Sequence, residues 1–161
     1  MDKVYYWDAD DVNSSHGHAA MDISFGEGPG RAEYVSWFPI GNWNLLTPGP
    51  TGVRSNYTDD RDDQHREAVA VVELRCLDSD RMRREWYSLK KTVRYTALTQ
   101  NCSTIVQRLL VAGGASFSPL VWQTVDDVII WTPLRLYTLA LLIRMESDTI
   151  IRKRRACWGG P

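Results

Sequence analysis

The stretch that begins at residue 102 constrains the fold of this chain more than any other. Its apolar residues recur at helical spacing, at Ile105, Val106, Leu109 and Leu110. This spacing predicts an amphipathic helix with one buried face, and the Gly-Gly pair at 113–114 predicts where that helix ends. Cys102 comes three and four positions before the first apolar pair, so we expect its thiol at the junction of the helix and the core.

Short β-like runs before this helix predict an antiparallel sheet. Residues 18–25 and 33–38 flank the turn cluster Gly-Glu-Gly-Pro-Gly at 26–30, which is typical of a hairpin with a long turn. The continuous apolar run at 68–74 predicts a central strand. Two more strands are predicted at residues 4–7 and 93–98.

Further helices are predicted from their capping residues. Asp78 is the expected N-cap of a helix over residues 78–90. The Thr-Pro pair at 132–133 predicts the start of an apolar helix that runs to about residue 145. A Ser-Pro pair at 118–119 repeats that pattern and predicts a shorter segment before it.

Residues 39–67 are rich in proline and glycine and predict a long loop, a feature that in compact domains is usually functional or disordered. The acidic run from Asp59 to Asp63 lies within it. This run lacks the alternating ligands, the glycine and the distal glutamate of a calcium-binding loop. We therefore expect a solvated loop there.

Length and composition predict one domain. The 161 residues are 43% hydrophobic, which suits a single core at about residues 14–114 with a helical extension at about 118–150. The net charge of −1 gives no general attraction to nucleic acid or to an anionic membrane. The acidic N-terminus is unlike a signal peptide, and the longest apolar run, at 128–143, is too interrupted to span a bilayer. These features predict a cytoplasmic location or secretion by a signal-independent route.

Cys102 is the predicted nucleophile among three cysteines. A helix start brings partial positive charge and free N–H groups, and both favour the thiolate. The neighbours of Cys102 are polar, which argues against an apolar socket for the thiol. Cys76 and Cys157 have no such setting, so we expect a core thiol at a strand end and a tail thiol. The sequence shows no metal-binding spacing, so no metal and no cofactor are expected.

His18 is the predicted base. It starts the strand at 18–25 within a Gly-His-Ala-Ala segment, whose small neighbours let a helix approach closely. A histidine fixed on a strand can take the proton of a thiol and later return it. His16 has the same strand parity and is the alternative base, whereas His65 falls in the charged loop.

A third polar residue usually orients a pair of this kind. If the hairpin turns at 26–30, His18 faces a position between Ser36 and Pro39, so Ser36 is the candidate. Asp22, on the His18 face of the same strand, is a second option.

An oxyanion would need donors near the nucleophile. The backbone N–H of Cys102 is one candidate. The side chains of Gln100 and Asn101 are two others, and spacing alone does not choose between them.

Three segments carry a resemblance to a known family. They are residues 17–20 (Gly-His-Ala-Ala), 34–39 (Tyr-Val-Ser-Trp-Phe-Pro) and 95–103 (Tyr-Thr-Ala-Leu-Thr-Gln-Asn-Cys-Ser). With the histidine first and the cysteine last, the chain resembles the circularly permuted papain-like hydrolases over about residues 14–114. That group includes the PPPDE peptidases and the permuted NlpC-type enzymes related to lecithin–retinol acyltransferases.

The resemblance implies an α+β fold, in which an antiparallel sheet packs against a catalytic helix and C-terminal helices are added. It implies a His18–Cys102 dyad that cleaves an amide, isopeptide or ester bond through an acyl-enzyme. Members of the group also hydrolyse peptidoglycan amides, deamidate glutamine or transfer acyl chains. The chain also looks like toxin and effector domains of bacterial secretion systems. The implied partners are a protein, peptide or peptidoglycan substrate and a cognate immunity protein.

Two alternatives remain open at the level of sequence. The tryptophans and the long loop suit a non-catalytic protein-binding module on the same scaffold. Nucleic-acid binding has only the basic run at 152–155 in its favour, for which a solvated tail is the simpler interpretation.

Overall fold

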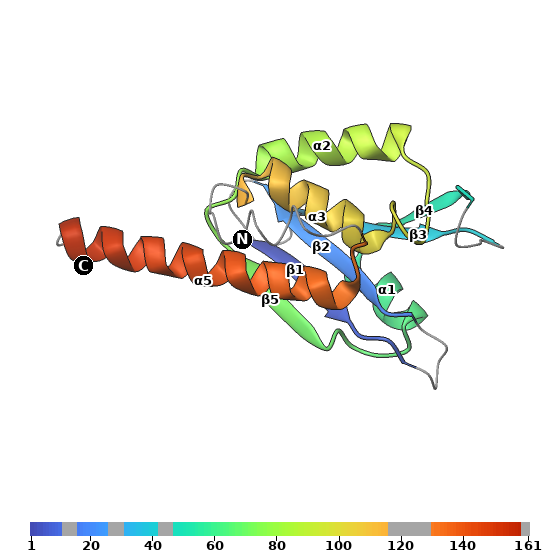
Figure 1. Ribbon diagram of the computed structural model, residues 1–161, viewed down its shortest axis with the longest axis horizontal. Coiled ribbons are helices and arrows are strands. Elements are labelled where there is room, and N and C mark those ends of the chain that lie inside the picture. Colours follow the sequence, from blue (N-terminus) through green and yellow to red (C-terminus); the bar gives the residue numbers. More distant parts are fainter. Residues whose placement is uncertain (11–15, 26–30, 42–46, 116–129, 159–161) are drawn as a thin grey trace.

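The computed structural model describes residues 1–10, 16–25, 31–41, 47–115 and 130–158, with side chains described as far as residue 149. These parts form an α+β domain in which helices pack on a five-stranded antiparallel sheet of order β4-β3-β2-β1-β5 (Figure 1). The strands are β1 (Asp2–Trp7), β2 (His18–Ser24), β3 (Ala32–Pro39), β4 (Thr51–Arg54) and β5 (Ala70–Leu74). The helices in the described ranges are α1 (Tyr57–Asp63), α2 (Ser79–Thr92), α3 (Cys102–Ala112) and α5 (Pro133–Trp158). The predicted α+β class is confirmed.

The main core lies between the sheet and the helices α2, α3 and α5. Alternate residues of β2 point into it, among them Met21 and Ile23, and the apolar face of α3 meets them with Ile105 and Leu109. All four side chains are fully buried. Burial of a side chain of this size stabilises a fold by about 1.5–3 kcal/mol, so this packing fixes α3 firmly against β2.

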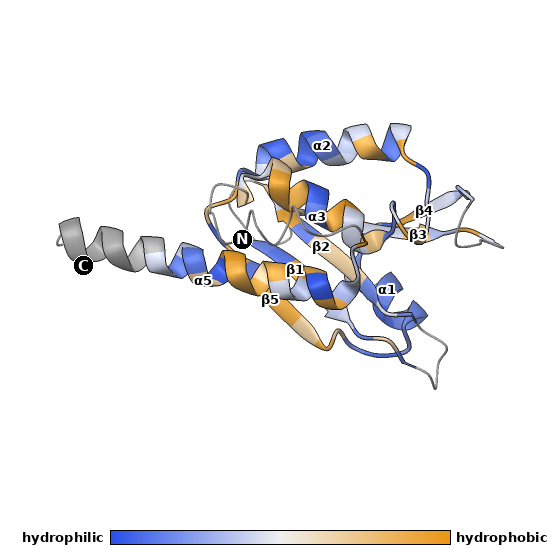
Figure 2. Cartoon of the chain, in the orientation of Figure 1, coloured by the Kyte–Doolittle hydropathy of each residue, from blue (hydrophilic) through white to orange (hydrophobic). Residues whose placement is uncertain are grey.

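A smaller aromatic cluster on the opposite face of the sheet holds α1. Tyr5 and Trp7 of β1 and Tyr34 of β3 are buried there, and Tyr57 of α1 packs against them. The ring centroids of Tyr5 and Tyr57 are 4.9 Å apart. α1 is a short, mostly hydrophilic helix (Figure 2), so this aromatic contact rather than an apolar stripe fastens it to the sheet.

The predicted hairpin is confirmed as β2 and β3. Ala20 pairs with Ser36, and Asp22 pairs with Tyr34. His18 therefore lies one alternate position beyond the Ala20–Ser36 pair, on the same face of the sheet as Ser36. The turn residues 26–30 lie outside the described residues.

The prediction of a loop across residues 39–67 is wrong, because β4 and α1 lie within that range. Asn56 starts α1, since its side-chain oxygen accepts the backbone N–H of Asp59 at 3.0 Å. An N-cap of this kind stabilises a helix whose polar composition alone would suit a solvated loop. The departure places an acidic helix where the sequence indicated only a solvated acidic run.

Two strand predictions also need correction. The apolar run at 68–74 forms β5 at the edge of the sheet rather than at its centre, paired with β1 alone. Helices cover one face of β5, so Val72 is buried whereas Val71 is 45% exposed. Residues 93–98 form no strand; Tyr95 and Thr96 make isolated bridges that shape the turn before α3.

The helix predictions hold at their starts. α2 is capped by Asp78 and buries Met82, Trp86 and Leu89, as expected. α5 begins at Pro133 but continues to Trp158 rather than to about residue 145, and its last turns extend beyond the sheet (Figure 1). No described helix is long and apolar enough to cross a membrane. The predicted start at 118–119 lies outside the described residues.

Candidate active site

Cys102 is the first residue of α3, as predicted. Asn101 is the N-cap, and its side-chain oxygen accepts the backbone N–H of Thr104 at 2.9 Å. Cys102 is 7% exposed and belongs to the main core cluster, so the thiol lies at the junction of the helix and the core. The next residue of the helix, Ser103, is also buried, and its Oγ lies 3.9 Å from the Cys102 Sγ.

Asn101 ties three segments together. Its Nδ2 donates to the backbone oxygen of Ala97 at 2.9 Å and to that of Trp131 at 2.8 Å. Both amide hydrogens are therefore engaged, which leaves the side chain as a cap and an anchor with no hydrogen for an oxyanion. Gln100 is anchored through its backbone oxygen, which accepts the indole N–H of Trp37 at 3.1 Å.

We expect Asn101→Ala to lower the free energy of unfolding by about 2–4 kcal/mol, because the helix loses its cap and two backbone oxygens lose their donor. Asp78→Ala is the matched control, since Asp78 caps α2 through the N–H of Arg81 at an exposed site. That control should cost only about 1 kcal/mol. Urea denaturation of both variants measures the difference, and equal losses would contradict the anchoring role of Asn101.

His18 begins β2 and is 6% exposed. Its Nε2 lies 3.1 Å from Oδ2 of Asp60 and 3.2 Å from Oγ of Ser36. The preceding residue, Gly17, has φ +82°, and a Cβ there would come within 3.0 Å of the backbone oxygen of Trp7. A glycine is therefore needed at this point for the chain to turn into β2 with the imidazole in place.

Asp60 is the site residue that the sequence did not reveal. It lies on α1, is 2% exposed, and receives hydrogen bonds on both carboxylate oxygens. Tyr34 donates its phenol O–H to Oδ2 at 2.6 Å, and Ser36 donates to Oδ1 at 2.9 Å. Arg54 of β4 approaches Oδ1 with its Nε at 3.5 Å. The prediction of a solvated acidic run is thus wrong for Asp60, which is buried beside His18.

Cys102 and His18 interact directly and shift each other's protonation. Burial raises the pKa of the Cys102 thiol, but the charge of His18 and a hydrogen bond with it hold that pKa below its ordinary value. Burial lowers the pKa of His18, but the charge of Cys102 and a hydrogen bond to Asp60 outweigh this effect and raise it to about 10. The Nε2 atom of His18 faces Asp60 at 3.1 Å.

The Asp60 carboxylate, which is hydrogen-bonded to His18, is ionised at neutral pH. Burial raises the pKa of Asp60, but hydrogen bonds and charge from His18, together with the bonds from Tyr34 and Ser36, hold it below its ordinary value. The arrangement thus favours a thiolate, an imidazolium and a carboxylate in sequence, with opposite charges adjacent.

Cys102 lines a cavity of about 220 Å³. The lining residues are His16, Gly17, Tyr95, Ala97, Asn101, Cys102, Ser103, Ile130, Trp131, Thr132 and Pro133. His16, the alternative base, therefore lies in the wall of the same cavity, while His18 is the histidine whose charge lowers the pKa of Cys102. Much of the lining is apolar, and it comes from three separate stretches of the chain.

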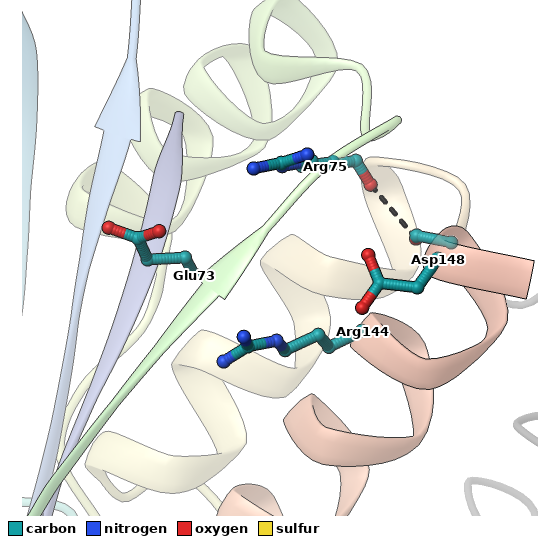
Figure 3. A pocket seen from close by; sticks show the side chains of 5 residues that line it. Glu73, Arg75, Arg144 and Asp148 are labelled. Atoms are coloured by element: carbon teal, nitrogen blue, oxygen red, sulfur yellow. Dashed lines mark hydrogen bonds between the residues drawn. The ribbon is translucent and has the colours of Figure 1, made fainter. Parts of the chain in front are cut away.

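A second hollow, of about 170 Å³, lies between β5 and α5 (Figure 3). Glu73 and Arg75 face Arg144 and Asp148 across it, and Ser147 donates to the backbone oxygen of Arg75 at 3.1 Å. The described residues that line it include no thiol and no imidazole, so this hollow offers neither a nucleophile nor a base of the predicted kind.

The remaining candidate residues lie apart from Cys102, His18 and Asp60. Asp22 accepts the phenol O–H of Tyr5 at 2.6 Å, so its carboxylate is engaged with β1. Cys76 is exposed and has φ +64°, so the prediction of a core thiol is wrong there: the chain turns outward just after β5 ends. The side chain of Cys157 lies outside the described residues.

Comparison with known proteins finds a family and a bacterial relative that are similar to this chain. The family described as IcsB middle domain matches residues 50–158, a range that contains both Asp60 and Cys102. The "Multifunctional-autoprocessing repeats-in-toxin" of Vibrio cholerae serotype O1 is 32% identical over 91 residues, which are 55% of this chain and 2% of that protein. This chain therefore corresponds to a small part of that toxin. No solved structure matches the chain. The family match covers well over half of the sequence, and the chain belongs to the IcsB middle domain family.

Proposed function

We propose that this domain is a cysteine hydrolase in which Cys102 is the nucleophile, His18 the acid and base, and Asp60 the residue that orients and charges His18. The observation that carries the proposal is the buried series Cys102–His18–Asp60 beside a cavity. Asp60 takes the third role, for which Ser36 is the sequence-based candidate, and Ser36 supports it by donating to the same carboxylate. An aligned nucleophile, base and orienting group is the arrangement that activates thiols for acyl transfer.

The reaction would proceed through a thioester. The Cys102 thiolate, whose proton rests on His18, attacks the carbonyl carbon of an amide, isopeptide or ester. The tetrahedral intermediate collapses as the carbon–nitrogen or carbon–oxygen bond breaks, and the His18 imidazolium gives its proton to the leaving atom. Neutral His18 then takes a proton from water as the oxygen attacks the thioester. The acyl group leaves as an acid, and the thiolate–imidazolium pair is restored.

The first turn of α3 supplies a donor for the oxyanion. Cys102 is the first residue after the N-cap, so its backbone N–H has no partner within the helix. The N–H and the positive end of the helix would stabilise negative charge on the former carbonyl oxygen. Gln100 remains a proposal for a second donor, because it lies two positions before Cys102.

The bacterial toxin relative supports a role as a toxin or effector domain that acts on a protein. The order of the site residues, with the histidine strand before the cysteine helix, supports a permuted papain-like arrangement. Cleavage of an amide or isopeptide bond in a protein substrate is therefore the form of the hydrolase proposal that we favour.

Selective alkylation tests this proposal without a known substrate. We expect iodoacetamide at pH 7 to modify Cys102 at least about tenfold faster than Cys76, because an ordinary thiol is only a few per cent thiolate at that pH. The comparison is sharp, since Cys76 is exposed whereas Cys102 is buried. Peptide mass spectrometry follows both sites. Labelling that ranks the two thiols by exposure would contradict the proposal and favour a non-catalytic binding module.

Acyl transfer to an acceptor other than water is a second candidate function. The observation in its favour is the apolar wall of the cavity, which Ile130, Trp131 and Pro133 line together with Cys102. Such a wall suits an apolar acyl group and leaves water at a disadvantage in the second step. The ratio of free acid to amide product, measured with an activated ester and an added primary amine, separates the two functions.

A further inference from the structure

Tyr34 and Asp60 are joined by a short hydrogen bond within the buried site. The phenol O–H of Tyr34 reaches Oδ2 of Asp60 at 2.6 Å, and the same oxygen lies 3.1 Å from Nε2 of His18. Tyr34 is 7% exposed, and it reaches the carboxylate from β3, whereas Asp60 belongs to α1. One carboxylate oxygen thus links a phenol on one element to an imidazole on another.

We propose that Tyr34 is a positioning residue of this site, whose O–H keeps the Asp60 carboxylate ionised and aims its Oδ2 at His18. The inference rests on the proposed function, because it concerns how the Cys102–His18 pair is maintained. Tyr34 touches no substrate, and it acts through Asp60 alone.

The geometry explains why a fixed donor is needed at this oxygen. A buried carboxylate in the interior is costly unless each oxygen is hydrogen-bonded. Ser36 donates to Oδ1, and the charged Arg54 side chain lies beside that oxygen, so the partners of Oδ2 are Tyr34 and His18. Burial and the charge of Asp60 raise the pKa of Tyr34, so the phenol keeps its proton and remains a donor at every pH at which the protein is folded.

Other groups face this part of the site and enter the pH dependence. Among the described residues they are Cys102 of α3 beside His18, Arg54 of β4 with its partner Asp63, and the Tyr5–Asp22 pair beside Tyr34. Of these, only Arg54 approaches the Asp60 carboxylate itself, with its Nε 3.5 Å from Oδ1. Removing the Tyr34 hydroxyl leaves Arg54 and Ser36 in place and so isolates the effect of one donor.

The sheet offers a matched control for this experiment. Tyr5 donates to Oδ2 of Asp22 at 2.6 Å, the same bond type at the same length. The rings of Tyr5 and Tyr34 are 5.9 Å apart, so the two tyrosines share one aromatic cluster. Tyr5→Phe therefore reproduces the structural cost of Tyr34→Phe without touching the carboxylate beside His18.

The measurement is the rate of alkylation of Cys102 by iodoacetamide between pH 4 and pH 9, in protein that carries Cys76→Ser and Cys157→Ser. Loss of a hydrogen bond raises the pKa of a carboxylate, and protonated Asp60 no longer supports the imidazolium, so the proton returns to Cys102. We expect Tyr34→Phe to move the acid limb of the profile upward by about one pH unit. Tyr5→Phe should leave the limb in place, although both variants lower the melting temperature by a similar amount.

The outcomes separate the inference from the proposed function. An unmoved limb in Tyr34→Phe, or equal shifts in both variants, would overturn the positioning role. An unreactive Cys102 in the parent protein would instead overturn the proposed function itself. If Tyr34→Phe does not fold, a fluorinated tyrosine placed at position 34 is the second variant. Its stronger O–H donor should move the acid limb to lower pH, and an unmoved limb would again overturn the inference.

Discussion

We expect Cys102→Ser to reduce turnover of an activated ester by at least about 10³-fold, because a hydroxyl at this site stays protonated where the thiol is ionised. The His18 imidazolium holds the pKa of Cys102 below its ordinary value, but it cannot bring a serine hydroxyl into the neutral range. The substitution is nearly isosteric, so the fold should persist. Initial rates with a p-nitrophenyl ester, together with thermal melts, check both parts of this expectation.

Cys76→Ser is the control for this experiment, because Cys76 is an exposed thiol without a histidine partner in the structure as described. It should retain the full rate. Ester turnover that survives in Cys102→Ser to within about tenfold of the parent rate would show that another group performs the chemistry.

Asp60→Asn should lower turnover by about 10²–10⁴-fold, mostly in kcat, since the orienting carboxylate of such a unit acts on the imidazole rather than on substrate binding. The amide is neutral, so the imidazolium on His18 loses its countercharge. Tyr34 and Ser36 both donate to this group, and an amide nitrogen in either position would leave one of them without an acceptor.

Asp22→Asn is the matched control for Asp60→Asn, because Asp22 accepts an equally short phenol bond but has Tyr5 as its partner. It should leave kcat within about twofold of the parent value. Asp60→Asn should also change how stability depends on pH in acid, and this effect is measured separately from kcat. The folded pKa of Asp60 lies below its unfolded value, so its stabilisation is complete above about pH 4 and is lost as the pH falls through the folded pKa. Equal kcat values in the two variants would contradict the role of Asp60.

The two residues proposed to react could be predicted because each has a local signature. Cys102 follows a capping asparagine and precedes an apolar helical face, and both features are visible in adjacent residues. His18 opens a strand whose turn and partner lie nearby in sequence. Their side-by-side placement is an expectation from the resemblance, and it depends on the packing of α3 against β2, which the apolar patterns support.

Asp60 could not be found in the same way, because its role depends on contacts far along the chain. α1 has seven residues and no apolar stripe, so its acidic composition is indistinguishable from that of a solvated loop. Two weak signals were present. Asn56 precedes Asp59 by three positions, as in a capped helix, and Tyr57 precedes Asp60 by three, which puts an aromatic and a carboxylate on one helical face.

The pattern of apolar and β-forming residues also gave wrong predictions for two segments. The apolar run at 68–74 has the composition of a central strand, yet β5 lies at the edge, where it pairs with β1 alone and α5 packs against it. Residues 93–98 have β-forming side chains, but Tyr95 and Thr96 are used to shape the turn that positions Asn101 and Cys102. Tertiary context overrides propensity in both segments.

The central claim, that His18 holds Cys102 as a thiolate, is tested most directly by the ultraviolet absorbance of the thiolate near 240 nm during a pH titration. The titrated protein carries Cys76→Ser and Cys157→Ser, and it is compared with the same protein carrying His18→Ala. We expect a midpoint well below the value of about 8.5 for an ordinary thiol, and a rise to or above that value when His18 is replaced. An ordinary midpoint in the parent protein, or one that His18→Ala leaves unchanged, would contradict the account.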